Sequence, residues 1–191
     1  MFKEYELPFS TCIGGWFIPN KICDDIIKYF NKNQKDSGPG EIGLNGKFVI
    51  NPNIKESVDI RIDNLNNDKK IYDYKVHLQK VLFLYLKKYR YANDVERFNL
   101  ESFNIQKYSK KGGYKFWHHE RKGRDTANRV LTFMTYLNDV KKGGTDFFYQ
   151  ELNTPAKKGL TLIWPVDWTH THRSQIANQE KIITTGWFEF I

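Results

Sequence analysis

The stretch VLTFMTYLNDVKKGGTDF, residues 130–147, joins a long β-branched and aromatic run to a second, shorter one through a Gly-Gly pair. β-Branched and aromatic residues favour strands, and the lysines and glycines at 141–144 are typical of a turn. The stretch therefore predicts two consecutive strands of an antiparallel sheet.

From about Phe98 onward, the chain shows the same alternation of β-branched and aromatic runs with turn-forming residues. Further strand-like runs lie at 103–109, 160–165 and 182–190, and turn-forming segments lie at 110–115, 153–159 and 174–180. No long helical period interrupts this region. We therefore expect residues 98–191 to form an antiparallel sandwich or jelly roll.

Two amphipathic segments precede the strands. In PNKICDDIIKYFNKN, residues 19–33, apolar residues recur every three or four positions, and Asn20 is a plausible cap. Residues 68–89 show the same period with lysines on the opposite face. Both segments predict helices, whereas the Gly-Pro-Gly content of residues 36–43 indicates a turn or loop.

Composition points to a single domain without membrane association. The 191 residues suit one domain, no run approaches the ~18 apolar residues of a membrane span, and the N-terminus lacks an apolar signal core. The two cysteines, Cys12 and Cys23, give no disulfide framework, so we expect reduced, buried thiols in a cytoplasmic protein.

The net charge of +8 and the isoelectric point near 9.3 favour acidic partners such as nucleic acid or acidic protein segments. Many of the lysines adjoin turn glycines, however, and solvated loops explain them equally well. The charge leaves both interpretations open.

Four of the five histidines occur in two clusters, at 118–119 and at 170–172. If the segment YKFWHHE is extended, His118 and Glu120 share one face and His119 points to the other. A zinc-protease motif is excluded because position 123 is glycine. Two histidines and one carboxylate are instead the ligand set of non-haem Fe(II) oxygenases, and either histidine of the second cluster could complete it.

Lys181 adds a specific signal, because it follows His172 by nine residues at the head of a strand. A buried cation near a metal needs a partner charge, which the distal carboxylate of 2-oxoglutarate would supply. From about Phe103 to Phe190 the chain resembles the catalytic domain of the prolyl 4-hydroxylase-like Fe(II)/2-oxoglutarate dioxygenases, including phage-encoded members. Seven elements occur in the family's order: Tyr108, His118-x-Glu120, TYLNDVKKGGTDF, KKGLTLIWP, His172, Lys181 and GWFEF.

The resemblance implies a mixed α+β fold, with a double-stranded β-helix (jelly-roll) core at about 98–191 and a helical support at about 1–97. It implies Fe(II) as cofactor, with 2-oxoglutarate and O2 as co-substrates. The residue roles it implies are His118, Glu120 and His172 as iron ligands; Lys181, Tyr136 and Tyr108 at 2-oxoglutarate; Arg129 and Trp187 in the substrate cleft; and Tyr114 at its mouth. His172 is preferred to His170 because its spacing to Lys181 fits the family.

The sequence departs from the family pattern at Glu120, where aspartate is usual. The extra methylene pushes the carboxylate outward and demands a backbone adjustment. The resemblance implies a hydroxylase of protein or peptide side chains, with proline as the family default. Two alternatives stay open: the same oxygenase chemistry on nucleic acid, and a non-catalytic metal-binding jelly roll.

Overall fold

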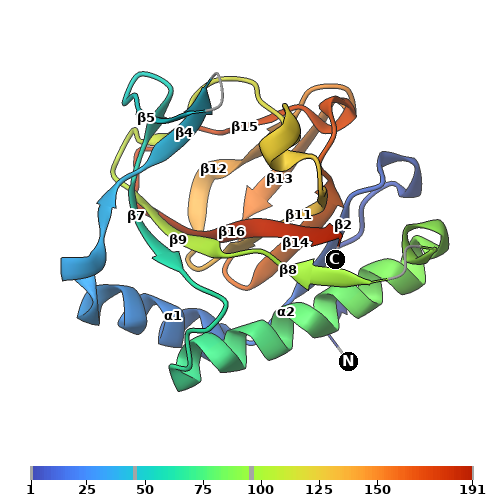
Figure 1. The fold of residues 1–191 in the computed structure, drawn as a ribbon, viewed down its shortest axis with the longest axis horizontal. Helices are drawn as coiled ribbons and strands as arrows, with labels where there is room; N and C mark the ends of the chain where they lie inside the picture. Colours follow the sequence, from blue (N-terminus) through green and yellow to red (C-terminus); the bar gives the residue numbers. More distant parts are fainter. Residues whose placement is uncertain (1, 45–46, 95–96, 191) are drawn as a thin grey trace.

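The computed structural model describes residues 2–44, 47–94 and 97–190 (Figure 1). Within these ranges the strands are paired antiparallel and form a major sheet, a minor sheet and two separate strand pairs. The major sheet has the order β1 (Lys3–Glu4), β2 (Gly14–Phe17), β14 (Leu160–Pro165), β11 (Arg129–Tyr136), β16 (Lys181–Phe190), β9 (Phe103–Tyr108), β7 (Val58–Ile62) and β3 (Gly38–Pro39), with β8 (Phe98–Leu100) also paired to β16.

The minor sheet has the order β13 (Leu152–Ala156), β12 (Val140–Phe147) and β15 (His172–Ser174). Two further pairs join β6 (Lys55–Glu56) to β10 (Gly113–Tyr114) and β4 (Glu41–Leu44) to β5 (Lys47–Ile50). Single turns of 3-10 helix are η1 (Phe9–Thr11), η2 (Gln34–Asp36), η3 (Arg90–Asn93), η4 (Arg124–Thr126) and η5 (Trp168–His170).

Two α-helices, α1 (Asn20–Lys32) and α2 (Lys69–Lys88), lie together along one side of the major sheet, and the minor sheet lies on its other side (Figure 1). The apolar faces expected from their periodicity are buried. Tyr74 of α2 is fastened to the sheet, because its hydroxyl lies 3.0 Å from Thr135 Oγ1 and 2.5 Å from Thr184 Oγ1. The predicted helices are confirmed, but Asn20 is the first helical residue, and the side chain of Asp68 caps α2.

Register places the interior of the jelly roll on one face of the major sheet. Tyr136 pairs with Ile183, and Lys181, two residues earlier on β16, pairs with Tyr108. Because side chains alternate along strands, these four residues point to the same face, toward the minor sheet. The opposite face carries Thr135, Thr184 and the residues that pack on the helices. The mixed α+β jelly-roll prediction is confirmed.

Three local expectations are wrong. Residues 141–144 do not form the turn between the first two strands, because they lie inside β12 as a bulge. The turn lies earlier, at Asn138 and Asp139. Their side chains accept hydrogen bonds from Ile182 N and Lys158 N, respectively. Residues 152–156 form β13 rather than a turn, and Pro155 is tolerated because β13 is an edge strand. The segment 36–43 contains β3 and the start of β4.

The N-terminal part is more than a helical support, since β2 and β7 enter the major sheet. Cys23 is buried as expected, but Cys12, which ends η1 with a left-handed φ of 54°, is exposed. Within the described ranges, neither helix is long and apolar enough to cross a membrane.

Candidate active site

Three side chains from two distant segments of the chain converge at one place. His118, Glu120 and His172 each offer a ligand atom, and these atoms all lie within 4.8 Å of one another. Glu120 Oε1 is 3.5 Å from His118 Nε2 and 3.4 Å from His172 Nε2. The structure thus brings together the three residues expected as metal ligands.

Backbone pairing positions this group. His118 and His172 form a reciprocal antiparallel bridge, with N–H···O distances of 3.0 and 2.8 Å, and Glu120 N donates to Val166 O at 3.0 Å. The segment 115–120 is otherwise not a regular strand. The expected alternation still holds locally, since His118 and Glu120 point to the same place and His119 is not part of the group.

Both histidines are oriented by a second hydrogen bond. His118 Nδ1 lies 3.0 Å from Phe116 O, and His172 Nδ1 lies 2.9 Å from His170 O. A carbonyl can only accept, so each Nδ1 carries the proton and each Nε2 presents its lone pair to Glu120. This is the arrangement by which outer hydrogen bonds orient metal-binding histidines.

His170 lies close in sequence but is engaged elsewhere. Its Nε2 is 2.9 Å from Thr11 O and its Nδ1 is 3.0 Å from Thr169 Oγ1, so both ring nitrogens have protein partners. The geometry therefore favours His172 over His170 as the third member.

Aromatic rings enclose the histidines. Tyr114 stacks on His118 with ring centroids 3.5 Å apart, and Trp164 and Phe147 pack on His172 at 5.1 and 5.7 Å. Burial raises the pKa of Tyr114 to about 12, which keeps this phenol neutral at physiological pH.

The protonation states match metal binding. Burial and the neighbouring His172 lower the pKa of His118 to about 3. Burial alone would raise the pKa of Glu120, but the neighbouring His172, His118 and Arg129 lower it to about 2. At neutral pH the site therefore offers a neutral imidazole and a carboxylate, the forms in which these side chains bind metals.

Lys181 is a buried cation on the same inner face. Its Nζ donates to Gly143 O at 2.9 Å and lies 3.5 Å from Gln175 O, and it stands 5.2 Å from the centre of the Tyr108 ring. Burial lowers its pKa to about 8. Among the described residues no carboxylate forms an ion pair with it, so a ligand carboxylate would meet an uncompensated charge.

The two tyrosines expected beside Lys181 are both buried. Tyr136 Oη lies 2.7 Å from Thr145 Oγ1, whereas Tyr108 Oη donates to Gln106 Oε1 at 2.5 Å. Burial raises the pKa of Tyr136 to about 12 and raises that of Tyr108 well above its usual value. Gln106 in turn donates to Asp59, which pairs with the buried Lys55. Sequence reasoning missed this network, because Lys55 and Asp59 stand far from any motif.

Arg129 and Trp187 form one unit. The Arg129 guanidinium lies 3.5 Å from the centre of the Trp187 ring and makes a bidentate pair with Glu101, at 2.7 and 2.8 Å. Glu101 was not expected from the sequence, since only the pairing of β8 with β16 brings it opposite these residues.

A row of polar groups without partners crosses the inner face beside this unit. Thr132 pairs with Trp164 on β14 and with Trp187 on β16, so the three side chains share one face. Thr132 Oγ1 and both indole Nε1 atoms are buried and have no hydrogen-bond partner among the described residues. Such groups cost stability unless a ligand or water satisfies them, and they often mark functional sites.

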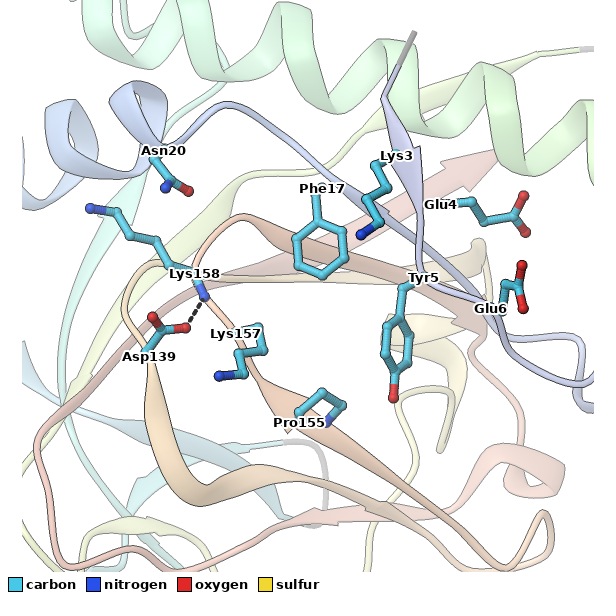
Figure 2. Close-up of a pocket in the computed structure, with 10 residues that line it drawn as sticks. All are labelled: Lys3, Glu4, Tyr5, Glu6, Phe17, Asn20, Asp139, Pro155, Lys157 and Lys158. Atoms are coloured by element: carbon cyan, nitrogen blue, oxygen red, sulfur yellow. Dashed lines mark hydrogen bonds between the residues drawn. The ribbon is translucent and has the colours of Figure 1, made fainter.

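A surface cavity of 590 Å³ lies in another part of the molecule (Figure 2). It is lined by β1, β2 and the turn before β14, with Tyr5 and Phe17 on its wall and Lys157 and Lys158 at its edge. None of the residues expected in the active site lines it.

Comparisons with known proteins agree with this geometry. Residues 103–189 match the model of the 2OG-Fe(II) oxygenase superfamily. A prolyl-4-hydroxylase of Pseudomonas putida matches with TM-score 0.70 and 16% identity, over 94% of this chain and 92% of its own. A search of curated protein sequences found no significant match.

Two further solved structures share the fold. The collagen prolyl hydroxylase of Paramecium bursaria Chlorella virus 1, solved with 2OG, matches with TM-score 0.68 and 18% identity over 100% of this chain and 96% of its own. A Trichoplax adhaerens prolyl hydroxylase, solved with a hypoxia-inducible factor peptide, matches with TM-score 0.69 and 15% identity over 92% and 83%. The jelly-roll core, residues 103–189, is thus that of a 2-oxoglutarate-dependent dioxygenase, and the chain has the fold of the prolyl hydroxylases.

Proposed function

We propose that this dioxygenase hydroxylates proline in a protein or peptide. The observation that carries the proposal is the convergence of His118, Glu120 and His172 next to a buried, unpaired Lys181, within a fold shared with three prolyl hydroxylases. Those relatives supply the substrate class, and the side chains of this chain supply the chemistry.

We propose His118, Glu120 and His172 as the ligands of Fe(II). The donor set fits, because two imidazoles with free Nε2 lone pairs and one carboxylate form a facial triad with three open positions. When bound, Fe(II) supplies the activation of O2 that couples conversion of 2-oxoglutarate to succinate with hydroxylation of a C–H bond. The enclosing rings of Tyr114, Phe147 and Trp164 keep bulk water from the ligands.

Lys181 would hold the distal carboxylate of 2-oxoglutarate. A charged ammonium that has only carbonyl partners gains most from an incoming carboxylate. Tyr136 would add a hydrogen bond by turning its hydroxyl from Thr145, and Tyr108, held by Gln106, would lie against the co-substrate.

The Arg129–Trp187 unit would position the substrate. The indole offers an apolar face for a proline ring, and the cation stacked on it is fixed by Glu101. The unpartnered Nε1 of Trp187 could donate to a peptide carbonyl, which is the acceptor that an imino acid residue always offers.

The decisive experiment measures succinate release together with a +16 Da product. Proline-containing peptides, alanine-substituted peptides and oligonucleotides would each be incubated with iron, 2-oxoglutarate and O2. Hydroxylation of the proline peptides alone supports the proposal. A modified oligonucleotide would support the alternative drawn from the +8 net charge, and absence of any succinate would support a non-catalytic jelly roll.

The acidic or nucleic-acid-associated character of the substrate stays a proposal, motivated by the same net charge. We also propose a cytoplasmic location, because Cys12 and Cys23 are free thiols. A fluorescent fusion imaged in the host cell would test it, and an exported protein would contradict it.

A further inference from the structure

Four exposed aromatic rings form a continuous surface, the aromatic ladder, made of Trp117, Phe148, Tyr149 and Trp168. Successive ring centroids are 5.1, 5.1 and 5.6 Å apart, and each pair is close to perpendicular. Their exposed fractions are 37%, 52%, 57% and 60% in that order. Scattered exposed aromatics need no explanation, but a contiguous group of this kind marks an interaction site.

The aromatic ladder adjoins the proposed active site. Trp117 immediately precedes His118, Trp168 lies four residues before His172, and the two middle rings directly follow Phe147, which packs on His172. Two of the three segments that carry the ladder therefore also carry the metal-binding group, and the reciprocal bridge between His118 and His172 ties these two together.

The rings are held in place by neighbouring polar groups. The Arg173 guanidinium lies 4.3 Å from the centre of the Trp117 ring and is itself paired with Asp146. Gln150 Nε2 donates to Thr169 O at 3.0 Å, which fastens the turn after β12 to the segment carrying Trp168. A surface fixed in this way loses little conformational entropy when a partner binds.

We propose that the aromatic ladder binds a proline-rich segment of the protein substrate in the polyproline II conformation, a proposal that rests on the proposed prolyl hydroxylase activity. Perpendicular rings present alternating faces and edges, and both can contact proline rings. Two steps along the ladder span at most about 10 Å, a reach comparable with the roughly 9 Å of one polyproline II turn.

The chemistry also favours proline over other chains. Aromatic-lined surfaces are the common receptors of polyproline II segments, whose stiffness lowers the entropy lost on binding. Proline has no N–H to donate, so its recognition depends on ring contacts, and the ladder supplies four rings. A segment on the ladder would lead toward His118 and His172 and raise the local concentration of target prolines there.

Fluorescence anisotropy with a labelled ten-residue polyproline and a labelled Gly-Ser peptide of equal length tests the proposal without turnover. The protein carries no added iron, so binding is measured whether or not it is a hydroxylase. We expect Trp168→Ala and Tyr149→Ala to weaken polyproline binding about tenfold or more, the loss typical of an aromatic anchor. Phe83→Ala, which removes an equally exposed ring on α2, should leave binding unchanged.

Turnover gives a second, independent readout. The ratio of kcat/KM for a long proline-rich peptide to that for a short single-proline peptide should fall at least tenfold in Trp168→Ala. Equal polyproline affinity in wild type and both ladder variants would overturn the proposal even if the enzyme hydroxylates proline. Loss of a dimer in Trp168→Ala, seen by light scattering, would instead assign the surface to a second copy of the chain, and equal binding of the Gly-Ser peptide would overturn specificity for proline.

Discussion

The Lys181 ammonium donates to the carbonyl oxygen of Gly143 at 2.9 Å, and this contact joins the head of β16 to the bulge of β12. At the bulge Gly144 lies so close to Thr154 O that no Cβ would fit, and Lys142, two residues earlier, takes a left-handed φ of 54°. The Gly-Gly pair therefore shapes the surroundings of Lys181 rather than a turn.

Lys181→Met should lose 2-oxoglutarate but stabilise the protein. Loss of one partner of a desolvated ion pair costs about 3–5 kcal/mol, so the affinity should fall more than a hundredfold. A pKa of about 8 in place of the ordinary 10.5 means that burying the charge costs about 3 kcal/mol at pH 7. The substitution leaves the Gly143 carbonyl without its donor, which costs about 1 kcal/mol. We therefore expect the free energy of unfolding to rise by roughly 2 kcal/mol. Calorimetric titration of the Mn(II)-loaded protein and urea unfolding measure the two effects, and unchanged affinity would remove Lys181 from the co-substrate site.

The same residue predicts a pH dependence. Only the protonated ammonium attracts a carboxylate, and with a pKa of about 8 it is about one-tenth protonated at pH 9, so the affinity should fall about tenfold between pH 7 and pH 9. Stability should move in the opposite sense. The unfolded chain binds the proton more tightly, so the free energy of unfolding should rise with pH from about 8 to 10.5. The Lys181→Met variant provides the control, since it should lack this rise. A wild-type affinity for 2-oxoglutarate that stays constant across pH 8 would contradict the prediction.

Thr132 and Thr135 offer a matched pair on one strand, because both side chains are fully buried. Thr135 Oγ1 has partners in Tyr74 and Thr161, whereas Thr132 Oγ1 has none in the part of the chain that the structure describes. Thr135→Val should therefore destabilise the fold by about 1–3 kcal/mol, and Thr132→Val should be neutral or stabilising. If the unpartnered row serves the substrate, Thr132→Val should still raise KM for the peptide. Equal destabilisation by both substitutions, measured by urea unfolding, would mean that Thr132 has a partner in solution.

Features that depend on residues close in sequence were predictable, whereas contacts between distant segments were not. Helices with a clear apolar period and strands of β-branched residues follow from local chemistry, as α2 and β11 show. The order of His118, Glu120 and His172 was predictable because a family pattern carries it. The pairing of Glu101 with Arg129 was not, because it depends on strand β8 docking beside β16.

Glu120 is where the family resemblance is weakest, and the structure shows how the longer carboxylate is accommodated. Its amide donates to Val166 O at 3.0 Å, which fixes the backbone, and from there Oε1 lies at 3.4 and 3.5 Å from the two Nε2 atoms. Glu120→Asp would withdraw the oxygen by about one C–C bond, on the order of 1.5 Å, while the backbone bond holds the chain in place. Misplacing a metal ligand by ~1 Å is costly, so turnover should fall tenfold or more although aspartate is the family's usual residue.

Glu120→Gln, which keeps the side-chain length but removes the charge, separates the effect of length from the effect of charge. Succinate release at saturating 2-oxoglutarate measures turnover, and calorimetry measures the affinity for Mn(II). Wild-type turnover and metal affinity in Glu120→Asp would mean that the backbone moves to follow the side chain.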